Sequence, residues 1–213
     1  CSFVNGGKKV EPTLISRIQN RRGKTIFNFD KRKCEGCEII NIDENYSPKI
    51  IDKKEQVISQ ETAYQMTSIL EGVVKRGTGK KLKVLGVPLA GKTGTTNNNT
   101  DTWFIGFTSN LVVGVYIGYD NPGSLGKFET GSKTAMPVFK EFIKKTANTF
   151  NARPFKVADN INMMVIDAKT GKKANPKTKL AIIESFKKND NKLDNISNNF
   201  DSRLNTTNIL KFY

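Results

Sequence analysis

The chain has 213 residues, of which 37% are hydrophobic, so it can bury one sizeable core. Its formal net charge of +15 favours polyanions, but the lysines are scattered and no nucleic-acid-binding motif is present, so we expect no nucleic-acid partner. The absence of histidine excludes Ser-His-Asp catalysis, Cys-His catalysis and His-ligated metals, and no apolar run reaches the ~18 residues that a membrane-spanning helix needs.

The first quarter of the chain predicts a hairpin followed by a polar excursion. Residues 13–18 and 25–29 are rich in β-branched and apolar side chains and flank the turn-forming residues 20–24. Residues 31–55 are polar, and we expect an irregular excursion from the main body. Within it, Cys34 and Cys37 are half of a four-thiolate zinc site with no second pair, so the open interpretations are a local disulfide or two unreactive thiols.

A helix is predicted next, beginning after Ser59. Ser59 is a suitable N-cap, Lys75 and Arg76 suit the negative end, and Gly77 is expected to end the helix in the left-handed conformation. The apolar stripe of this helix must pack on a sheet, and its members are Ala63, Met66, Leu70, Val73 and Val74.

Three successive runs predict that sheet: residues 89–95, 102–108 and 111–119. The second and third are joined by Ser109 and Asn110, so they should pair antiparallel. The third run is almost entirely apolar or glycine, and we expect it to be a central strand covered on both faces.

The rest of the chain predicts a second helix, one more strand and a tail. Residues 163–167 can form the strand, and the sequence beyond about Lys187 is too polar to offset its ordering entropy, so we expect disorder there. The helix spans about 135–147, and its apolar stripe comprises Ala135, Val138, Phe139, Phe142 and Ile143.

The segment from Gly86 to Thr93 fits two different chemistries. It satisfies the P-loop pattern G-x-x-x-x-G-K-[ST], which cradles phosphates only where the turn leads directly into a helix. Here the turn contains Pro88, and the residues after Thr93 are poor helix formers suited to a strand and a turn. We therefore favour the second interpretation, the Lys-Thr-Gly strand of serine acyl-transfer enzymes, and a strand at Lys92 would exclude the first.

The chemistry of an anion-binding strand matches these residues. A lysine cation and the hydroxyls of Thr93 and Thr95, which share one strand face, can hold a carboxylate by charge-assisted hydrogen bonds worth ~1.5–3 kcal/mol each. Gly94 between them leaves room for a substrate backbone, and the amide of Thr95 is a candidate oxyanion-hole donor.

The segments around this strand resemble class A, bifunctional penicillin-binding proteins, in the C-terminal part of the transpeptidase domain. The similarity covers nearly all of residues 1–150. Its motifs are NGGK (5–8), EP (11–12), ETAYQM (61–66), LEGVV (70–74), GTG (77–79), AGKTGTT (90–96), DTWFIGF (101–107), GYD (118–120) and ETG (129–131).

This resemblance implies an α/β (α+β) fold, a β-lactamase/transpeptidase-like antiparallel sheet flanked by helices, present as an incomplete fragment. Residues 1–150 would be the C-terminal part of the transpeptidase domain, including the excursion 31–55. Residues 151–186 would be a C-terminal extension, and 187–213 a disordered tail.

The same resemblance implies a peptidoglycan cross-linking enzyme. In this family a serine of S-x-x-K is acylated by a stem peptide that loses its terminal D-alanine, an amine of a neighbouring stem resolves the acyl-enzyme, and β-lactams mimic the D-Ala-D-Ala end. We therefore expect a serine-type D-Ala-D-Ala transpeptidase or carboxypeptidase joined to a glycosyltransferase. Its ligands would be stem peptides and β-lactams, with no cofactor and no metal, and it would lie on the periplasmic side of the inner membrane, anchored upstream of Cys1.

Residue by residue, the resemblance makes Lys92 catalytic and Thr93, Gly94 and Thr95 substrate-binding. The serine motifs of the family precede this strand, whereas every candidate in this chain follows it. We therefore expect no nucleophile and no activity in this chain alone; a parent that had lost its serine motifs would instead be a noncatalytic wall-binding module. The excluded candidates are Ser124-x-x-Lys127 in a loop, and Ser185-x-x-Lys188 and Ser197-Asn198-Asn199 at or in the tail.

Overall fold

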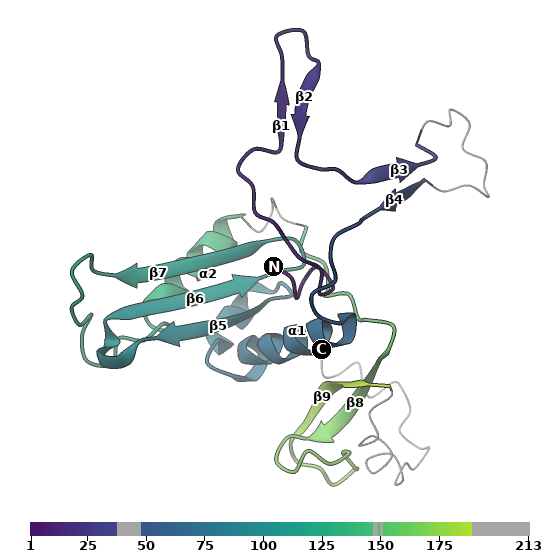
Figure 1. Ribbon diagram of the computed structural model, residues 1–213. Coiled ribbons are helices and arrows are strands. Elements are labelled where there is room, and N and C mark those ends of the chain that lie inside the picture. The colour runs from purple at the N-terminus through teal and green to yellow at the C-terminus, as the bar shows by residue number, and fades with distance from the viewer. Residues whose placement is uncertain (38–47, 147–148, 150, 189–213) are drawn as a thin grey trace.

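The centre of the protein is a three-stranded antiparallel sheet, seen in a computed structural model that describes residues 1–37, 48–146, 149 and 151–188 (Figure 1). Strands β5 (Ala90–Thr95), β6 (Asp101–Phe107) and β7 (Val112–Gly118) lie in the order β5-β6-β7, as the sequence predicts. The expectation that the third run is central is wrong. Strand β6 is central, and the residues of β7 alternate between exposed and half-buried, because only one face of the sheet is covered among the described residues.

Helix α1 (Gln60–Arg76) begins as predicted, with the Ser59 hydroxyl accepting a hydrogen bond from the Thr62 amide at 3.2 Å. The predicted left-handed ending is wrong, because Gly77 has φ −102° and ψ −150°. Glycine is needed there for a close approach instead, since a Cβ would lie 2.9 Å from Val73 Cα. On the predicted stripe Ala63 and Val74 are buried, and the others, Met66, Leu70 and Val73, are half-buried.

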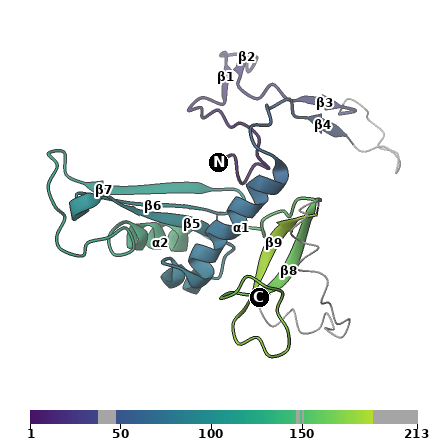
Figure 2. The same cartoon turned by 60° about the horizontal axis from the view of Figure 1, so that its bottom comes forward.

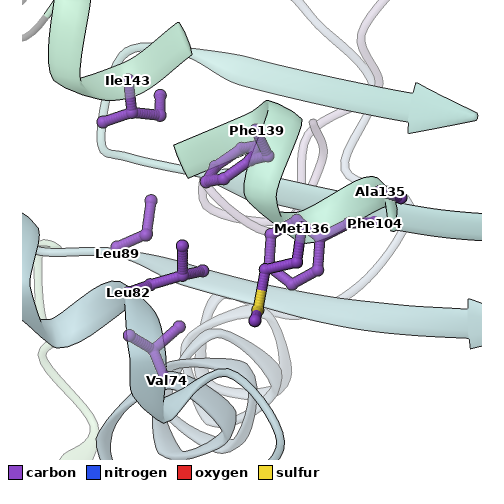
Figure 3. Packing of buried hydrophobic residues seen from close by; sticks show 8 residues of the cluster. All are labelled: Val74, Leu82, Leu89, Phe104, Ala135, Met136, Phe139 and Ile143. Atoms are coloured by element: carbon purple, nitrogen blue, oxygen red, sulfur yellow. The ribbon is translucent and has the colours of Figure 1, made fainter. Parts of the chain in front are cut away.

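Helix α2 (Ala135–Thr146) lies on the same face of the sheet as α1, and no helix of the described residues covers the other face (Figure 2). The Phe139 ring packs on that of Phe104 with centroids 4.7 Å apart, at the centre of the buried cluster (Figure 3). Two predicted stripe positions, Val138 and Phe142, are instead exposed, and Met136 takes an inward position. The core is completed by Val74, Ala135, Ile143, Leu89 and Leu82, the last from the short 3₁₀ helix η1 (Lys80–Leu85).

Two hairpins project from the body and form an arm, defined here as residues 9–37 and 48–55 (Figure 1). The predicted first hairpin is confirmed as β1 (Arg17–Gln19) paired with β2 (Thr25–Asn28). Its first strand begins later than expected, because the Thr13 hydroxyl bonds both the amide and the carbonyl of Ile15 and so diverts the backbone.

The excursion 31–55 is not wholly irregular, since β3 (Lys33–Glu35) pairs with β4 (Lys49–Ile51). Residues 38–47 lie outside the described part of the chain. The Cys34–Cys37 disulfide is formed, so that of the two interpretations of this pair the local disulfide is confirmed.

The base of the arm is closed by the backbone. The Lys9 amide donates to the Glu55 carbonyl at 2.8 Å, and the Val57 amide donates to the Gly7 carbonyl at 3.0 Å. Gly7 has φ +83°, and any side chain there would meet the Ile58 carbonyl. The arm therefore leaves and rejoins the body at one point.

Strands β8 (Ile161–Asp167) and β9 (Ala181–Lys187) form a separate ribbon against α1. The first strand is predicted by the sequence, and the second is not. Arg76 pairs with Glu184, and the Gln65 amide donates to the Ser185 carbonyl at 3.0 Å. Ser185 is therefore part of a strand and not of a tail; residues 189–213, where most of the predicted disorder falls, lie outside the described residues.

Candidate functional site

Strand β5 carries the predicted site in an extended conformation. Lys92, Thr93, Gly94 and Thr95 are its last four residues, so the P-loop interpretation is wrong. The strand pairs with β6 on one side only, and its other edge is open among the described residues. Such an edge presents unpaired backbone donors and acceptors to an extended ligand.

The first residue after β5 shows which way the backbone groups of the strand point. The Thr96 amide donates to the Asp101 carbonyl at 3.0 Å and so points towards β6. Because backbone groups alternate along an antiparallel strand, those of Thr95 and Thr93 point to the open edge. The predicted oxyanion donor, the Thr95 N–H, is thus available on that edge.

The side chains of the site divide between the two faces of the sheet. Thr93 lies opposite Phe104 on the helix-covered face, whereas Lys92 lies opposite Ile105 on the open face. The Lys92 ammonium group is exposed and donates to the Thr93 carbonyl at 2.8 Å. The cation therefore bends round the open edge, to the position where an extended ligand would meet the strand.

A second hydroxyl joins that of Thr93 and was not singled out by the sequence reasoning. Thr78 Oγ1 lies 3.4 Å from Thr93 Oγ1, because the chain turns sharply after α1. Gly79 allows this turn, since a Cβ there would approach Val73 O at 3.2 Å. The only sequence signal for Thr78 is its place in the GTG motif, which by itself predicts no contact with the strand.

The segment around Gly131 braces the end of the site from the helix side. Its amide donates to Thr95 Oγ1 at 3.1 Å. A Cβ on Gly131 would lie 2.6 Å from Gly94 O and would also meet the carbonyl of Trp103, so only glycine fits. The Thr95 hydroxyl thus has one acceptor position in use and keeps its own proton to donate, and this brace was likewise not assigned from the sequence.

The turn between β5 and β6 is organised by one carboxylate. Tyr116 donates to Asp101 at 2.7 Å, and the Thr100 hydroxyl donates to it at 2.9 Å. The hydrogen bond from Tyr116 and then that from Thr100 hold the pKa of Asp101 below its ordinary value, and the same contact raises the pKa of Tyr116. This network fixes the end of β5 from which Thr95 leads into the turn.

The described serines of the excluded S-x-x-K pairs do not stand at the start of a helix, although the loop that holds Ser124 is hydrogen-bonded to the turn after β5, from the Leu125 amide to the Asn99 carbonyl at 2.9 Å. Ser124 is exposed in the loop after β7, where its hydroxyl accepts from the Gly126 amide at 3.2 Å. Ser185 is buried in the ribbon that packs on α1. Ser197 lies outside the described residues. The described site therefore has a cation, hydroxyls and backbone donors for holding an anionic peptide end.

Comparison with known proteins gives a consistent result. A family model described as the penicillin binding protein transpeptidase domain matches residues 2–144. Penicillin-binding protein 1A of Rickettsia typhi is 43% identical over 189 residues, which are 88% of this chain and 24% of that protein. Penicillin-binding protein 1A of Pseudomonas aeruginosa is 32% identical over 218 residues, covering 88% of this chain and 26% of that protein.

A solved structure agrees with these relatives. The crystal structure of penicillin-binding protein 1A from Haemophilus influenzae superimposes with a TM-score of 0.68 at 27% identity, covering 87% of this chain and 30% of that chain. This chain thus spans about a quarter of the length of the curated relatives it matches. Within its described residues, no helix is both long enough and apolar enough to cross a bilayer.

Proposed function

This chain belongs to the penicillin-binding protein transpeptidase family, and from that premise we propose that it supplies the substrate-binding wall of an enzyme that cross-links peptidoglycan. The observation that carries the proposal is the extended run from Lys92 to Thr95 on an open sheet edge. An acyl-transfer enzyme needs such an edge to align the stem peptide before attack.

In this proposal the D-Ala-D-Ala end of a stem peptide lies along β5 as an added strand. Its carboxylate is held by the hydroxyls of Thr93 and Thr95, and Gly94 leaves room for its backbone. The Thr95 amide polarises the scissile carbonyl, a contact that in other acyl-transfer enzymes is worth ~10²–10³ in rate. Lys92 acts in catalysis by setting the electrostatic field for a serine–lysine pair.

That pair would come from a preceding segment of the protein. The enzyme would be of the serine type, acting as a D-Ala-D-Ala transpeptidase or carboxypeptidase in a bifunctional glycosyltransferase/transpeptidase. β-Lactams would acylate the same serine, and this chain alone would be inactive. The site would lie on the periplasmic side of the inner membrane, anchored through a preceding segment, where the disulfide between Cys34 and Cys37 suits an oxidising compartment.

We further propose the division of the chain that follows from this function. Residues 1–150 would complete the transpeptidase domain and 151–186 would form an extension. Two observations support this division: the family match ends at residue 144, and the ribbon β8–β9 pairs with itself and not with the central sheet. The end of β9 at Lys187 moves the start of any tail to later residues.

Intact-mass spectrometry after incubation with a labelled penicillin tests the first part of the proposal. We expect no covalent adduct on this chain alone, because neither Ser124, in a loop, nor Ser185, in a strand, stands at a helix start that would aim and activate its hydroxyl. An adduct of one penicillin, mapped to Ser124 or Ser185, would contradict it.

The second part needs the protein with its preceding segment. Lys92→Ala should slow penicillin acylation by about 10²-fold or more, because a cation at the reacting centre is removed. Lys144→Ala, an equal loss of charge at the exposed end of α2, should leave the rate unchanged. Equal acylation rates for the two variants would remove Lys92 from the mechanism, and no acylation of the unaltered protein would favour a wall-binding module.

A further inference from the structure

The arm exposes apolar side chains that do not pack on the body of the protein. Every residue of β1 and β2 is exposed, and neither strand packs on α1, α2 or the central sheet. A two-stranded hairpin of this size gains little stability by itself in water. Its exposed large hydrophobic residues are Leu14, Ile15, Ile18, Ile26, Phe27 and Phe29. Gathered apolar surface of this kind is typical of a contact site.

The charge of the hairpin has one sign. From residue 12 to residue 29 the sequence has four cations, Arg17, Arg21, Arg22 and Lys24, and no carboxylate. None of the four forms an ion pair within the described residues. Pairing of two copies of the hairpin would place four positive charges next to four others, so like-charge repulsion opposes self-association. The same charges favour an acidic partner.

Strand β2 offers an open edge to such a partner. The Phe29 amide donates to the Ser16 carbonyl at 2.9 Å and so points towards the β1 side. The Lys24 carbonyl, which accepts from the Asn20 amide at 2.9 Å, also points towards β1, and the register shifts by one residue between these two ends. By alternation from each end, the backbone groups of Thr25 and Asn28 point outward. They can accept one more strand without breaking any hydrogen bond of the hairpin.

The open edge leads to a cavity of about 600 Å³ at the foot of the arm. Phe27 and Phe29 supply its apolar lining. Part of its charged rim is already paired, because Arg32 contacts Asp30 at 2.6 Å and Lys9 contacts Glu55 at 3.8 Å. The rim also has Lys31, Lys53 and Lys54 together with two further carboxylates, Glu11 and Asp52, and Asp52 pairs with Lys8 at 3.5 Å. The aromatic anchors of the cavity, next to the four cations of the hairpin, match a protein segment that has apolar and acidic side chains.

We propose that the arm is a docking site for an extended acidic segment of a partner protein, which adds as a third strand along β2 and seats an apolar side chain between Phe27 and Phe29. The arrangement of the side chains favours a strand over a bilayer. The apolar pair of Ile18 and Phe27 lies between two polar pairs, Arg17 with Asn28 and Gln19 with Thr25, so the hairpin has no continuous apolar face. An added strand contacts both faces, and a bilayer contacts one.

The test uses the whole chain and a fluorescent ten-residue peptide that alternates valine and glutamate, measured by anisotropy. We expect saturable binding that weakens with salt, and no binding of the peptide in which lysine replaces glutamate. Arg21→Glu with Arg22→Glu should weaken binding about tenfold or more. The matched control, Lys169→Glu with Lys172→Glu in the β8–β9 loop, makes the same change of charge and should leave the affinity within about twofold.

A backbone variant separates strand addition from charge attraction. Asn28→Pro removes an outward N–H and no β1–β2 hydrogen bond, so it should weaken binding about tenfold while circular dichroism shows an intact fold. Equal binding of the lysine peptide, or equal weakening by the control pair, would overturn the proposal. Binding of phosphatidylglycerol vesicles that depends on Arg21 and Arg22, without binding of the glutamate peptide, would also overturn it and assign the arm to a membrane surface.

Discussion

The central sheet and the arm are built from the same kind of element and differ in what covers it. Strands β5, β6 and β7 lay one face on α1 and α2, and Phe104 of β6 is fully buried there. Strands β1 and β2 have neither face covered. Antiparallel pairing alone therefore gives an element its shape, and burial decides whether that element adds to global stability or remains available for contacts.

The largest expected difference between the two regions concerns two phenylalanines. Phe104→Ala removes a fully buried ring that packs at a tilt against Phe139, and should lower the free energy of unfolding by about 3–5 kcal/mol. Phe27→Ala in the arm should change it by less than ~1 kcal/mol, because that ring is 42% exposed. Urea denaturation monitored by tryptophan fluorescence measures both, and similar losses would mean that the arm belongs to the cooperative unit.

A smaller effect is expected where the brace meets the site. Gly131→Ala places a methyl group against Gly94 O and should cost about 1–3 kcal/mol of unfolding free energy while displacing the end of β5. Gly123→Ala, whose nearest neighbours would be 3.8 Å away, should cost less than ~0.5 kcal/mol. A Gly131→Ala variant as stable as the unaltered chain would show that Gly131 does not pack closely against Gly94 O.

Two hydroxyl groups that accept a hydrogen bond from a nearby amide offer a third comparison, and the larger expected loss of unfolding free energy is about 1 kcal/mol. Ser59→Ala removes the N-cap of α1, which packs on the sheet, and should lower the melting temperature by a few degrees. Thr13→Ala removes a similar local hydrogen bond to an amide in the arm. We expect no measurable change in the melting temperature for Thr13→Ala, and an equal shift for the two variants would erase the distinction between the regions.

The smallest effects concern two carboxylates, one in each region. Hydrogen bonds from Arg32 lower the pKa of Asp30 to about 2, and the bond from Tyr116 lowers the pKa of Asp101 below its ordinary value. A lowered pKa contributes stability above the ordinary value of 3.8, which is lost as the pH falls towards the folded-state value; for Asp30 this window is about 4 to 2.

Removing the hydrogen-bond donor of each carboxylate tests whether the two groups titrate independently. Arg32→Gln should raise the pKa of Asp30 alone, and Tyr116→Phe should raise that of Asp101 alone. Carboxyl carbon chemical shifts followed by NMR between pH 2 and 6 measure both values. A shift of Asp101 in the Arg32 variant would indicate that the arm and the sheet are coupled.

Periodicity and local chemistry predicted the elements that depend on near neighbours. The Ser59 cap, the turn between β6 and β7 and the extended Lys-Thr-Gly strand were all recognisable from adjacent residues. The predicted fold class, an antiparallel sheet flanked by helices in a transpeptidase-like arrangement, is confirmed by the structure and by its likeness to the Haemophilus influenzae protein.

Features that depend on distant residues were not predictable in the same way. The apolar run of β7 suits an edge strand as well as a central one, because what covers it is decided elsewhere. Gly77 and Gly131 are required by neighbours that lie across the fold or in the preceding turn, and not by their own φ angles. The pair of Thr78 and Thr93 is separated by 15 residues, and no spacing rule brings those hydroxyls together.

The closed base of the arm makes it an exchangeable cassette. The Lys9 amide nitrogen and the Glu55 carbonyl oxygen are only 2.8 Å apart. The arm is therefore attached to the body as a short loop would be, whatever residues it contains. Lengthening such a loop is inexpensive, at about 0.6 kcal/mol for each doubling of its length. Evolution or an engineer can therefore exchange the outer hairpins for a reporter domain or a different recognition module, while the central sheet and its two helices keep their geometry.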